Sequence, residues 1–248
     1  MFPRFLVAVA TFILTIPLLL QPGPARAQQE VDLLLVLAAD VSRSVDAQKF
    51  KLQRDGYAAA LVNPRVLKAI ETGPAGRIAI CFMEWSGPSA QAVMVDWTIV
   101  ANAADARRLG ERIREAPRPF MDRTAIGNAI DFSVRLLEGA PARSSRRVID
   151  VSGDGTSNAG RSLLEARDEA LAKGITINGL AILSEVPLPT SPMHTHPPGG
   201  LLAYFENNVI GGPGAFALAA EGFEAFGASI TSKLVKEIAA LDRHSPQP

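Results

Sequence analysis

Three short stretches of the chain carry hydroxyl and carboxylate side chains at spacings suited to binding a divalent cation. "LAADVSRSV" places Asp40, Ser42 and Ser44 at alternate positions directly after an apolar run. "DRTAIGN" places Thr124 at the predicted start of a helix, and "VSGDGTSN" places Asp154 just past a predicted strand. In an open parallel sheet, binding groups gather outside the carboxyl ends of the strands. We therefore expect these five side chains to converge.

All five side chains are hard oxygen donors, which suit Mg²⁺, Mn²⁺ or Ca²⁺. Mg²⁺ takes about six oxygen ligands and usually keeps some water. Three hydroxyls and two carboxylates would supply most of such a shell and leave a position open. Because hydroxyls are neutral ligands, the ion would retain much of its positive charge. The pattern therefore predicts a site that binds an external carboxylate.

Each motif alone has a simpler interpretation. Ser44 or Asp46 can cap the helix expected over 46–63, and Thr124 can cap the start of a later helix. Asp154 followed by glycine is typical of a turn. The combination of all three motifs on a matching strand and helix pattern favours a metal site.

Strand-like and helix-like patterns alternate along the chain from residue 31 onward. Strands are expected at 31–39, 77–85, 92–100, 146–153, 175–183 and 215–220, and helices at 46–63, 102–116, 124–140, 159–174, 200–208 and 223–241. This alternation predicts an α/β fold with a mostly parallel sheet and helices on both faces. The gap between 77–85 and 92–100 is too short for a helix, so we expect one antiparallel edge strand there.

With these motifs the chain resembles the von Willebrand factor A-type (vWA) domains that carry a metal-ion-dependent adhesion site (MIDAS). The residues that carry the resemblance are Asp40, Ser42, Ser44, Thr124, Asp154 and Gly155. It spans about residues 30–240, and more narrowly the chain looks like an uncharacterised group of exported bacterial single-domain proteins. The resemblance implies a Rossmann-like, doubly wound fold. It also implies that the serines and threonine ligate the ion directly, that the aspartates act through water, and that a partner's Glu or Asp completes the shell.

The chain departs from this family at several positions. Arg43 stands between the two serines, where the family often has glycine. Its guanidinium would repel the metal but could clamp an incoming carboxylate. In "FMEWSG", Glu84 and Ser86 are expected near the rim of the site, with no assigned role in the metal shell.

The stretch 184–200 contains five prolines and is interpreted as a surface loop within the domain. His194 and His196 in this loop are interpreted as solvated side chains, with a second metal site as the alternative. Cys81 is the only cysteine, so an internal disulfide is excluded.

Residues 1–27 have the pattern of a signal peptide, with Arg4, an apolar run and a small-x-small end at Ala25-Arg26-Ala27. We expect an exported protein, periplasmic or secreted, that meets a membrane only through this segment before cleavage; an uncleaved anchor is the alternative. The domain is expected at 28–242, with a flexible tail at 243–248. Basic and acidic residues number 25 each, so the charge balance gives no support to nucleic-acid binding.

The sequence favours a protein-binding module over an enzyme. It contains no Gly-x-Ser-x-Gly elbow and no phosphate-binding Gly-x-x-x-x-Gly-Lys loop. Two alternatives remain open: a vWA-like scaffold with a silent metal site that binds through the 184–200 loop, and a metal-assisted hydrolase. Oligomeric state and partner identity have no signal in the sequence.

Overall fold

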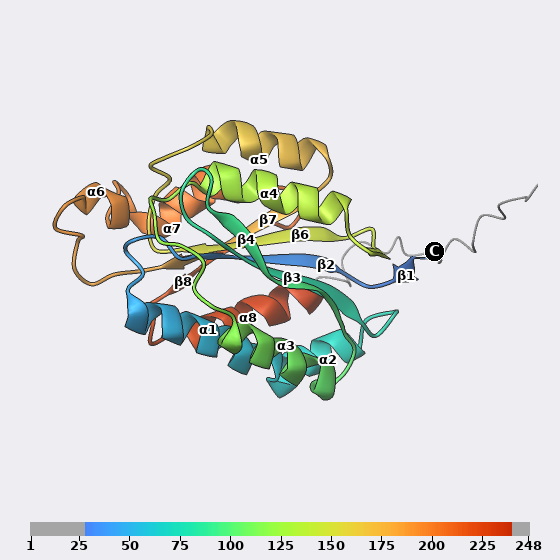
Figure 1. Ribbon diagram of the computed structural model, residues 1–248. Coiled ribbons are helices and arrows are strands. Elements are labelled where there is room, and N and C mark those ends of the chain that lie inside the picture. Colours follow the sequence, from blue (N-terminus) through green and yellow to red (C-terminus); the bar gives the residue numbers. More distant parts are fainter. Residues whose placement is uncertain (1–27, 240–248) are drawn as a thin grey trace, which may run out of the picture.

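A six-stranded sheet forms the middle layer of the protein (Figure 1). Its order is β4-β3-β2-β6-β7-β8, formed by β2 (Leu34–Asp40), β3 (Ile78–Trp85), β4 (Gln91–Val100), β6 (Arg147–Gly153), β7 (Thr176–Ile182) and β8 (Ala217–Ala220). Every neighbouring pair is parallel except β3 and β4, which are antiparallel at the edge. The predicted mostly parallel sheet with one reversed edge strand is confirmed.

The computed structural model describes residues 28–239. The predicted signal peptide at 1–27 and the tail at 243–248 lie outside the described residues. Among the helices of the described part, none has the length and apolar character needed to cross a membrane.

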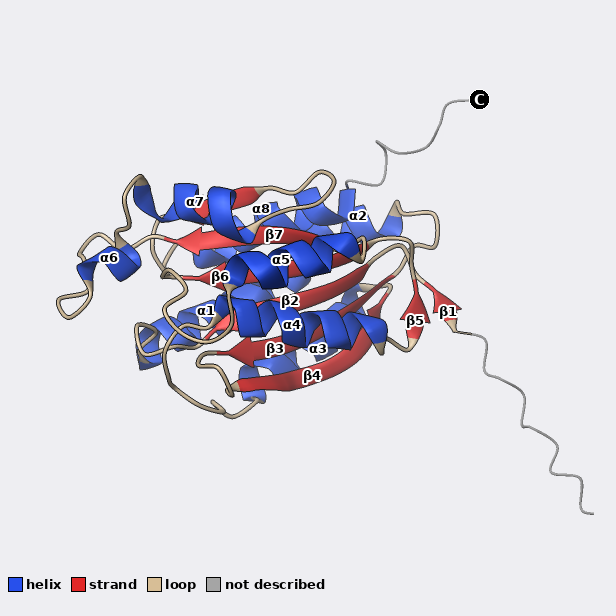
Figure 2. Ribbon diagram, turned by 90° about the horizontal axis from the view of Figure 1, so that it is seen from above, coloured by secondary structure: helices blue, strands red, loops and turns tan. Residues whose placement is uncertain are grey.

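Helices cover both faces of the sheet (Figures 1 and 2). One face carries α1 (Ala47–Leu61), α2 (Pro64–Glu71), α3 (Ala103–Glu115) and α8 (Phe226–Ala239). The other carries α4 (Ile126–Glu138), α5 (Leu163–Ala172), α7 (Gly200–Tyr204) and the π-helical turn η1 (Phe205–Val209). The two expected helical layers are therefore present.

The central strand β2 shows why the sheet is buried on both sides. Leu35 and Leu37 pack into the core under α1 and α8, whereas Val36 and Ala38 pack into the core under α4. Successive side chains of a strand point to opposite faces, so a continuously apolar run satisfies both layers. The strand ends at Asp40, and the loops that follow the parallel strands gather at one end of the sheet, at the left of Figure 1.

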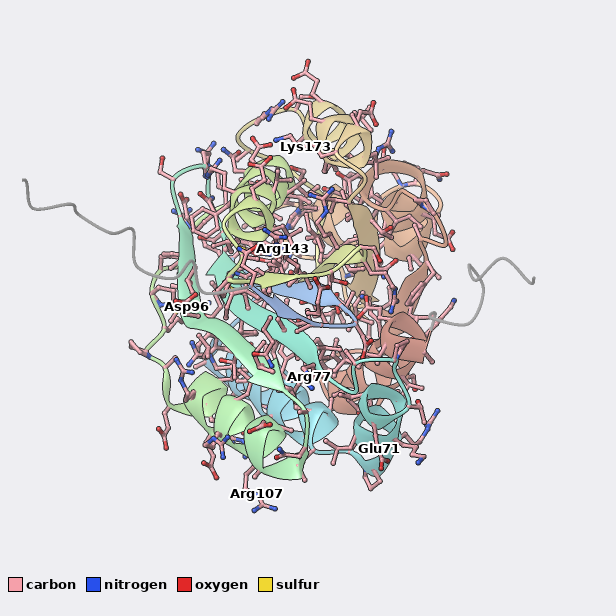
Figure 3. All side chains as sticks on the ribbon, turned by 90° about the vertical axis from the view of Figure 1, so that its right-hand side faces the viewer. Glu71, Arg77, Asp96, Arg107, Arg143 and Lys173 are labelled. Atoms are coloured by element: carbon pink, nitrogen blue, oxygen red, sulfur yellow. The ribbon has the colours of Figure 1, made fainter. Side chains whose placement is uncertain are left out.

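The structure adds elements that the sequence pattern did not indicate. Pro64 begins α2 instead of only ending α1, because Asn63 caps the new helix by accepting from the backbone N–H of Arg65 at 2.9 Å. β1 (Gln29–Glu30) pairs in parallel with β5 (Ala142–Arg143) at the opposite end of the molecule. That end, which faces the viewer in Figure 3, carries charged side chains of both signs, including Arg77.

Candidate metal centre

The loop after β2 is folded by its own side chains. Asp40 Oδ1 accepts a hydrogen bond from the backbone N–H of Ser42 at 2.7 Å. Asp46 caps α1 by accepting from the N–H of Lys49 at 2.9 Å. The helix cap is therefore Asp46, and Ser44 is left free for other contacts. Asp40, Ser42 and Ser44 are all buried.

Arg118 holds the same loop from outside, and sequence reasoning missed this residue. Its Nη2 donates to the backbone carbonyls of Val41 at 2.9 Å and Val45 at 2.7 Å. Its guanidinium lies 4.8 Å from the ring centre of Phe50. Arg118 lies in the irregular stretch "REAPRPF", which has no periodic pattern that would place it.

A chain of hydroxyl contacts joins this loop to the loop after β6. Ser42 Oγ lies 3.1 Å from Ser44 Oγ, and Ser44 Oγ donates to Asp154 Oδ1 at 2.5 Å. The strands β2 and β6 are parallel neighbours, so their carboxyl ends lie side by side. The structure therefore brings four of the five predicted side chains into one contact network.

Thr124 is bound by its backbone to Asn158, four residues after Asp154 in the loop that follows β6. Its backbone N–H donates to Asn158 Oδ1 at 3.0 Å, and the N–H of Asn158 donates to the Thr124 carbonyl at 2.8 Å. The Thr124 side chain is buried and does not cap α4, whose cap position is Ala125. The simpler interpretation of Thr124 as a helix cap is therefore wrong.

The two carboxylates of the site are poorly compensated. Among the described residues, Asp40 Oδ2 is buried without a hydrogen-bond partner, and a Cβ on Gly153 would lie 3.1 Å from it. Burial, with the nearby Asp154 charge, raises the pKa of Asp40 to about 8. Burial also raises the pKa of Asp154. A nearby cation is Lys49, whose Nζ lies 3.8 Å from Asp154 Oδ2.

These features fit a hard divalent cation. A buried carboxylate oxygen with no partner is costly unless a cation or a donor satisfies it. Within residues 28–239, no three His, Cys, Asp or Glu side chains group together as a metal site. The oxygen donors that the structure brings together at this place are the hydroxyls of Ser42 and Ser44 and the carboxylates of Asp40 and Asp154.

Three further residues that the sequence singled out beside the site differ in their surroundings. The Arg43 side chain is 71% exposed and lies 3.7 Å from Asp122 in an exposed ion pair. Glu84 is buried and bound by Arg54, with Nε to Oε1 at 2.8 Å and Nη2 to Oε2 at 3.0 Å. Ser86 is also buried. Glu84 is therefore a structural partner of Arg54, although it lies on β3 beside the end of β2, opposite Ala39. Ser86 lies next to Thr124, because its carbonyl accepts from the N–H of Ala125 at 2.8 Å.

His194 is the main departure from the predicted surface loop. It lies in the short helix α6 (Pro192–Thr195), is 6% exposed, and its Nε2 lies 3.4 Å from Thr124 Oγ1. Burial lowers its pKa. The interpretation of His194 as a solvated side chain is wrong, because its ring packs against Thr124 and Gly155. α6 itself lies beyond the carboxyl ends of the strands (Figures 1 and 2). His196 is half-buried.

A cavity of about 480 Å³ opens beside Asp154. It lies between the start of α1, the residues after β7 and the residues after β8. Its charged lining residues are Asp46, Lys49, Asp154, Glu185, Glu221 and Glu224. Of the five predicted site residues, Asp154 is the one that lines this cavity.

The fold is that of vWA domains. The pilus adhesin SpaC from Lactobacillus rhamnosus GG is similar with a TM-score of 0.60 and 13% identity over 86% of this chain and 31% of SpaC. Proximal thread matrix protein 1 (PTMP1) from the mussel byssus is described with a zinc-occupied MIDAS motif. It is similar with a TM-score of 0.58 and 14% identity over 86% of this chain and 49% of PTMP1. A von Willebrand factor type A protein from Catenulispora acidiphila is similar with a TM-score of 0.54 and 14% identity over 84% of this chain and 43% of that protein.

The chain thus spans less than half the length of each of these three proteins. At such low identity the likeness establishes the fold. No curated protein matches the chain. A family model does match, over residues 30–242. The chain belongs to the family described as "Protein of unknown function (DUF1194)", and it has the fold of a vWA domain.

Proposed function

We propose that the protein is an exported, metal-dependent protein-binding module of the adhesion type. Ser42, Ser44 and Thr124 would bind a divalent cation directly, and Asp40 and Asp154 would hold its water ligands. A Glu or Asp of a partner protein would bind to the cation. The single observation that carries the proposal is the buried Asp40 Oδ2, which has no partner among the described residues.

The roles of the chain's own residues follow from their contacts. Asp40 orients the loop through its bond to Ser42 N–H, and Ser44 ties that loop to Asp154. Neutral hydroxyl ligands leave a bound cation attractive to an incoming carboxylate. Arg118 holds the loop backbone from outside, so the hydroxyls are fixed before the ion arrives.

Two similar structures support this proposal. SpaC is described as a pilus adhesin, and PTMP1 is described with a zinc-occupied MIDAS motif. Both descriptions concern those proteins, and we extend their general type of activity to this chain. Mg²⁺, Mn²⁺ and Ca²⁺ are the ions that oxygen donors alone would favour.

The direct test is calorimetry of the purified protein with Mg²⁺ and Mn²⁺. We expect Ser42→Ala to reduce the affinity for the ion at least tenfold. Ser133→Ala is the matched control, because Ser133 is a buried serine of α4 that donates to the Ala129 carbonyl away from the site. No uptake of either ion, nor of Zn²⁺ or Co²⁺, by the wild type below the millimolar range would contradict the proposal.

The partner is tested by capture. Immobilised protein should retain a partner in Mg²⁺ and release it in EDTA, and Ser42→Ala should retain none. Peptides that carry a single exposed Glu should compete, whereas the same peptides with Gln should not. Capture that is equal in Mg²⁺ and EDTA would contradict the metal-dependent mode.

A second candidate function is binding through the 184–200 loop by a scaffold whose metal site is silent. Two large apolar side chains of this loop are exposed, Val186 at 69% and Met193 at 59%. If this mode operates, Val186→Asp should abolish capture and Asp40→Ala should leave it unchanged. We assign no catalytic role, because Ser42 stands where aspartate-nucleophile phosphoryl-transfer enzymes need a second acid; a phosphatase and esterase panel tests this.

A further inference from the structure

His194 lies at the candidate metal centre although no motif predicted it there. We infer that His194 Nε2 is an additional ligand of the same cation, which makes the site selective for an ion that accepts nitrogen, such as Zn²⁺ or Co²⁺, over Mg²⁺. This inference rests on the proposed function, since it requires a cation at the site. The inference thus gives the 184–200 segment a role in metal binding, because His194 belongs to it.

The first support is the position of the imidazole ring. Nε2 lies 3.4 Å from Thr124 Oγ1, and the ring is nearly fully buried. Two ligands of one ion at about 2.1 Å each lie about 3.0–3.4 Å apart. The spacing between Nε2 and the Thr124 hydroxyl is therefore compatible with both atoms binding the same ion.

The second support is the space that Gly155 leaves for the ring. A Cβ on residue 155 would lie 2.1 Å from His194 Nε2, so any other residue would displace the imidazole. Gly155 directly follows Asp154, the acid that Ser44 binds. The site loop and the His194 ring are thus shaped to fit each other.

The third support is the backbone that holds the histidine in place. The N–H of Thr156 donates to the His194 carbonyl at 2.9 Å. The N–H of His194 donates to the Ser191 carbonyl at 3.0 Å, and the N–H of Leu188 donates to Thr195 Oγ1 at 3.1 Å. The first of these contacts joins α6 to the Asp154 loop, and the other two order the 184–200 segment around α6.

The other ring nitrogen has a neighbour suited to a metal ligand. Nδ1 lies 3.4 Å from Thr156 Oγ1 and 3.5 Å from Asn158 Nδ2. A proton on Nδ1 that is donated to the Thr156 hydroxyl leaves the Nε2 lone pair free. Metal-binding histidines usually donate their second ring nitrogen in this way, which fixes the tautomer.

Ligand chemistry gives the expected selectivity. Mg²⁺ prefers oxygen, whereas imidazole suits Zn²⁺ and other late first-row ions. A shell of three hydroxyls and one imidazole, with the two acids acting through water, therefore favours Zn²⁺ or Co²⁺ more than a shell of oxygen donors alone would. His194 would fill one coordination position and leave another to water or to the carboxylate of a partner.

The test compares metal affinities of the purified protein by competition titration with Zn²⁺, Co²⁺ and Mg²⁺. We expect His194→Ala to weaken Zn²⁺ and Co²⁺ binding at least tenfold and to change Mg²⁺ binding less than threefold. His196→Ala is the matched control, because it removes a histidine two residues away, and it should change neither. Gly155→Ala, which leaves every proposed ligand in the chain, should reproduce the loss seen in His194→Ala.

X-ray absorption of the zinc-loaded protein gives a second readout. Imidazole scattering should appear in the wild type and in His196→Ala and be absent in His194→Ala. Unchanged zinc affinity and spectrum in His194→Ala would overturn the inference and leave the proposed function intact. A wild type that takes up none of the three ions would overturn both.

Discussion

Two pairs of buried carboxylates in this protein differ in what neutralises them. Asp150 and Glu237 lie in the core and share Lys233, whose Nζ is 2.7 Å from Asp150 Oδ1 and 2.5 Å from Glu237 Oε1. Asp40 and Asp154 lie at the end of the sheet, where Lys49 lies 3.8 Å from Asp154 and is one-third exposed. The core pair has its own buried cation, and the edge pair does not.

The same strand contributes to both pairs. Asp150 lies in the middle of β6 and faces α8, whereas Asp154 follows the end of that strand. Burial and Glu237 raise the pKa of Asp150 to about 7, while Lys233 opposes the rise. For Asp40, the rise to about 8 is opposed by hydrogen bonds from Ser42. The comparison teaches that a pair of buried acids with its own lysine is a structural pair. A pair of buried acids without such a lysine points to a cation that binds from solution.

The largest expected effect comes from removing the internal cation. Lys233→Met leaves Asp150 and Glu237 buried together without a positive charge, and should cost about 3–5 kcal/mol of unfolding free energy. Urea denaturation measures this. Lys236→Met on the same helix is the control, because Lys236 is exposed, and it should cost less than about 1 kcal/mol. A loss below 1 kcal/mol for Lys233→Met would break the comparison.

Replacing an acid of the edge pair should not lower the unfolding free energy as the loss of Lys233 does. In EDTA, Asp40→Asn should keep the unfolding free energy within about 1 kcal/mol of the wild type or raise it, because a neutral amide avoids the free-energy cost of burying a carboxyl group that would otherwise ionise. With metal at about 100 times its Kd, the wild type should gain about 2.7 kcal/mol and the variant almost nothing. Urea denaturation with and without metal measures both. A large loss of stability in EDTA would argue that Asp40 is a structural acid.

The unfolding free energy of the metal-free protein should depend on pH through Asp40. Folding raises the pKa of Asp40 from 3.8 to about 8, so between these values the folded protein keeps a proton that the unfolded chain releases. Stability in EDTA should therefore be highest below about pH 4 as far as this group is concerned, and should fall as pH rises through about 8. Asp40→Asn should flatten the curve from pH 5 to 9. An equal slope in wild type and variant would contradict the assignment.

The smallest effect concerns two arginines near the same loop. Arg43→Ala should change metal affinity less than twofold and stability by less than about 0.5 kcal/mol, because its ion pair with Asp122 is exposed. Arg118→Met removes the donor to the Val41 and Val45 carbonyls and should cost about 1–3 kcal/mol. Calorimetry and urea denaturation of both variants test this. A loss of metal affinity or of stability above these limits in Arg43→Ala would show that Arg43 acts at the site, as its predicted role as a carboxylate clamp requires.

Much of the fold could be predicted because its signals are local. The apolar run of β2 shows burial on both faces, and the short gap before β4 shows a reversed strand. The pattern did not indicate α2, because a proline such as Pro64 can end one helix or begin the next, and the Asn63 side chain that caps α2 decides between these outcomes. His194 escaped prediction because a proline-rich stretch is typical of exposed loops, and its burial depends on Gly155 about 40 residues earlier.

The sequence by itself determined the buried strand and the carboxylate and two hydroxyls that follow it at alternate positions. These features depend only on neighbouring residues, so they can be recognised from the order of residue types. Only the tertiary structure decided which distant groups meet them. Ser44 binds Asp154, His194 lies against Gly155, and Lys233 neutralises Asp150. These pairs form through the order of the strands and the packing of helices, and such long-range contacts leave no periodic pattern in the chain.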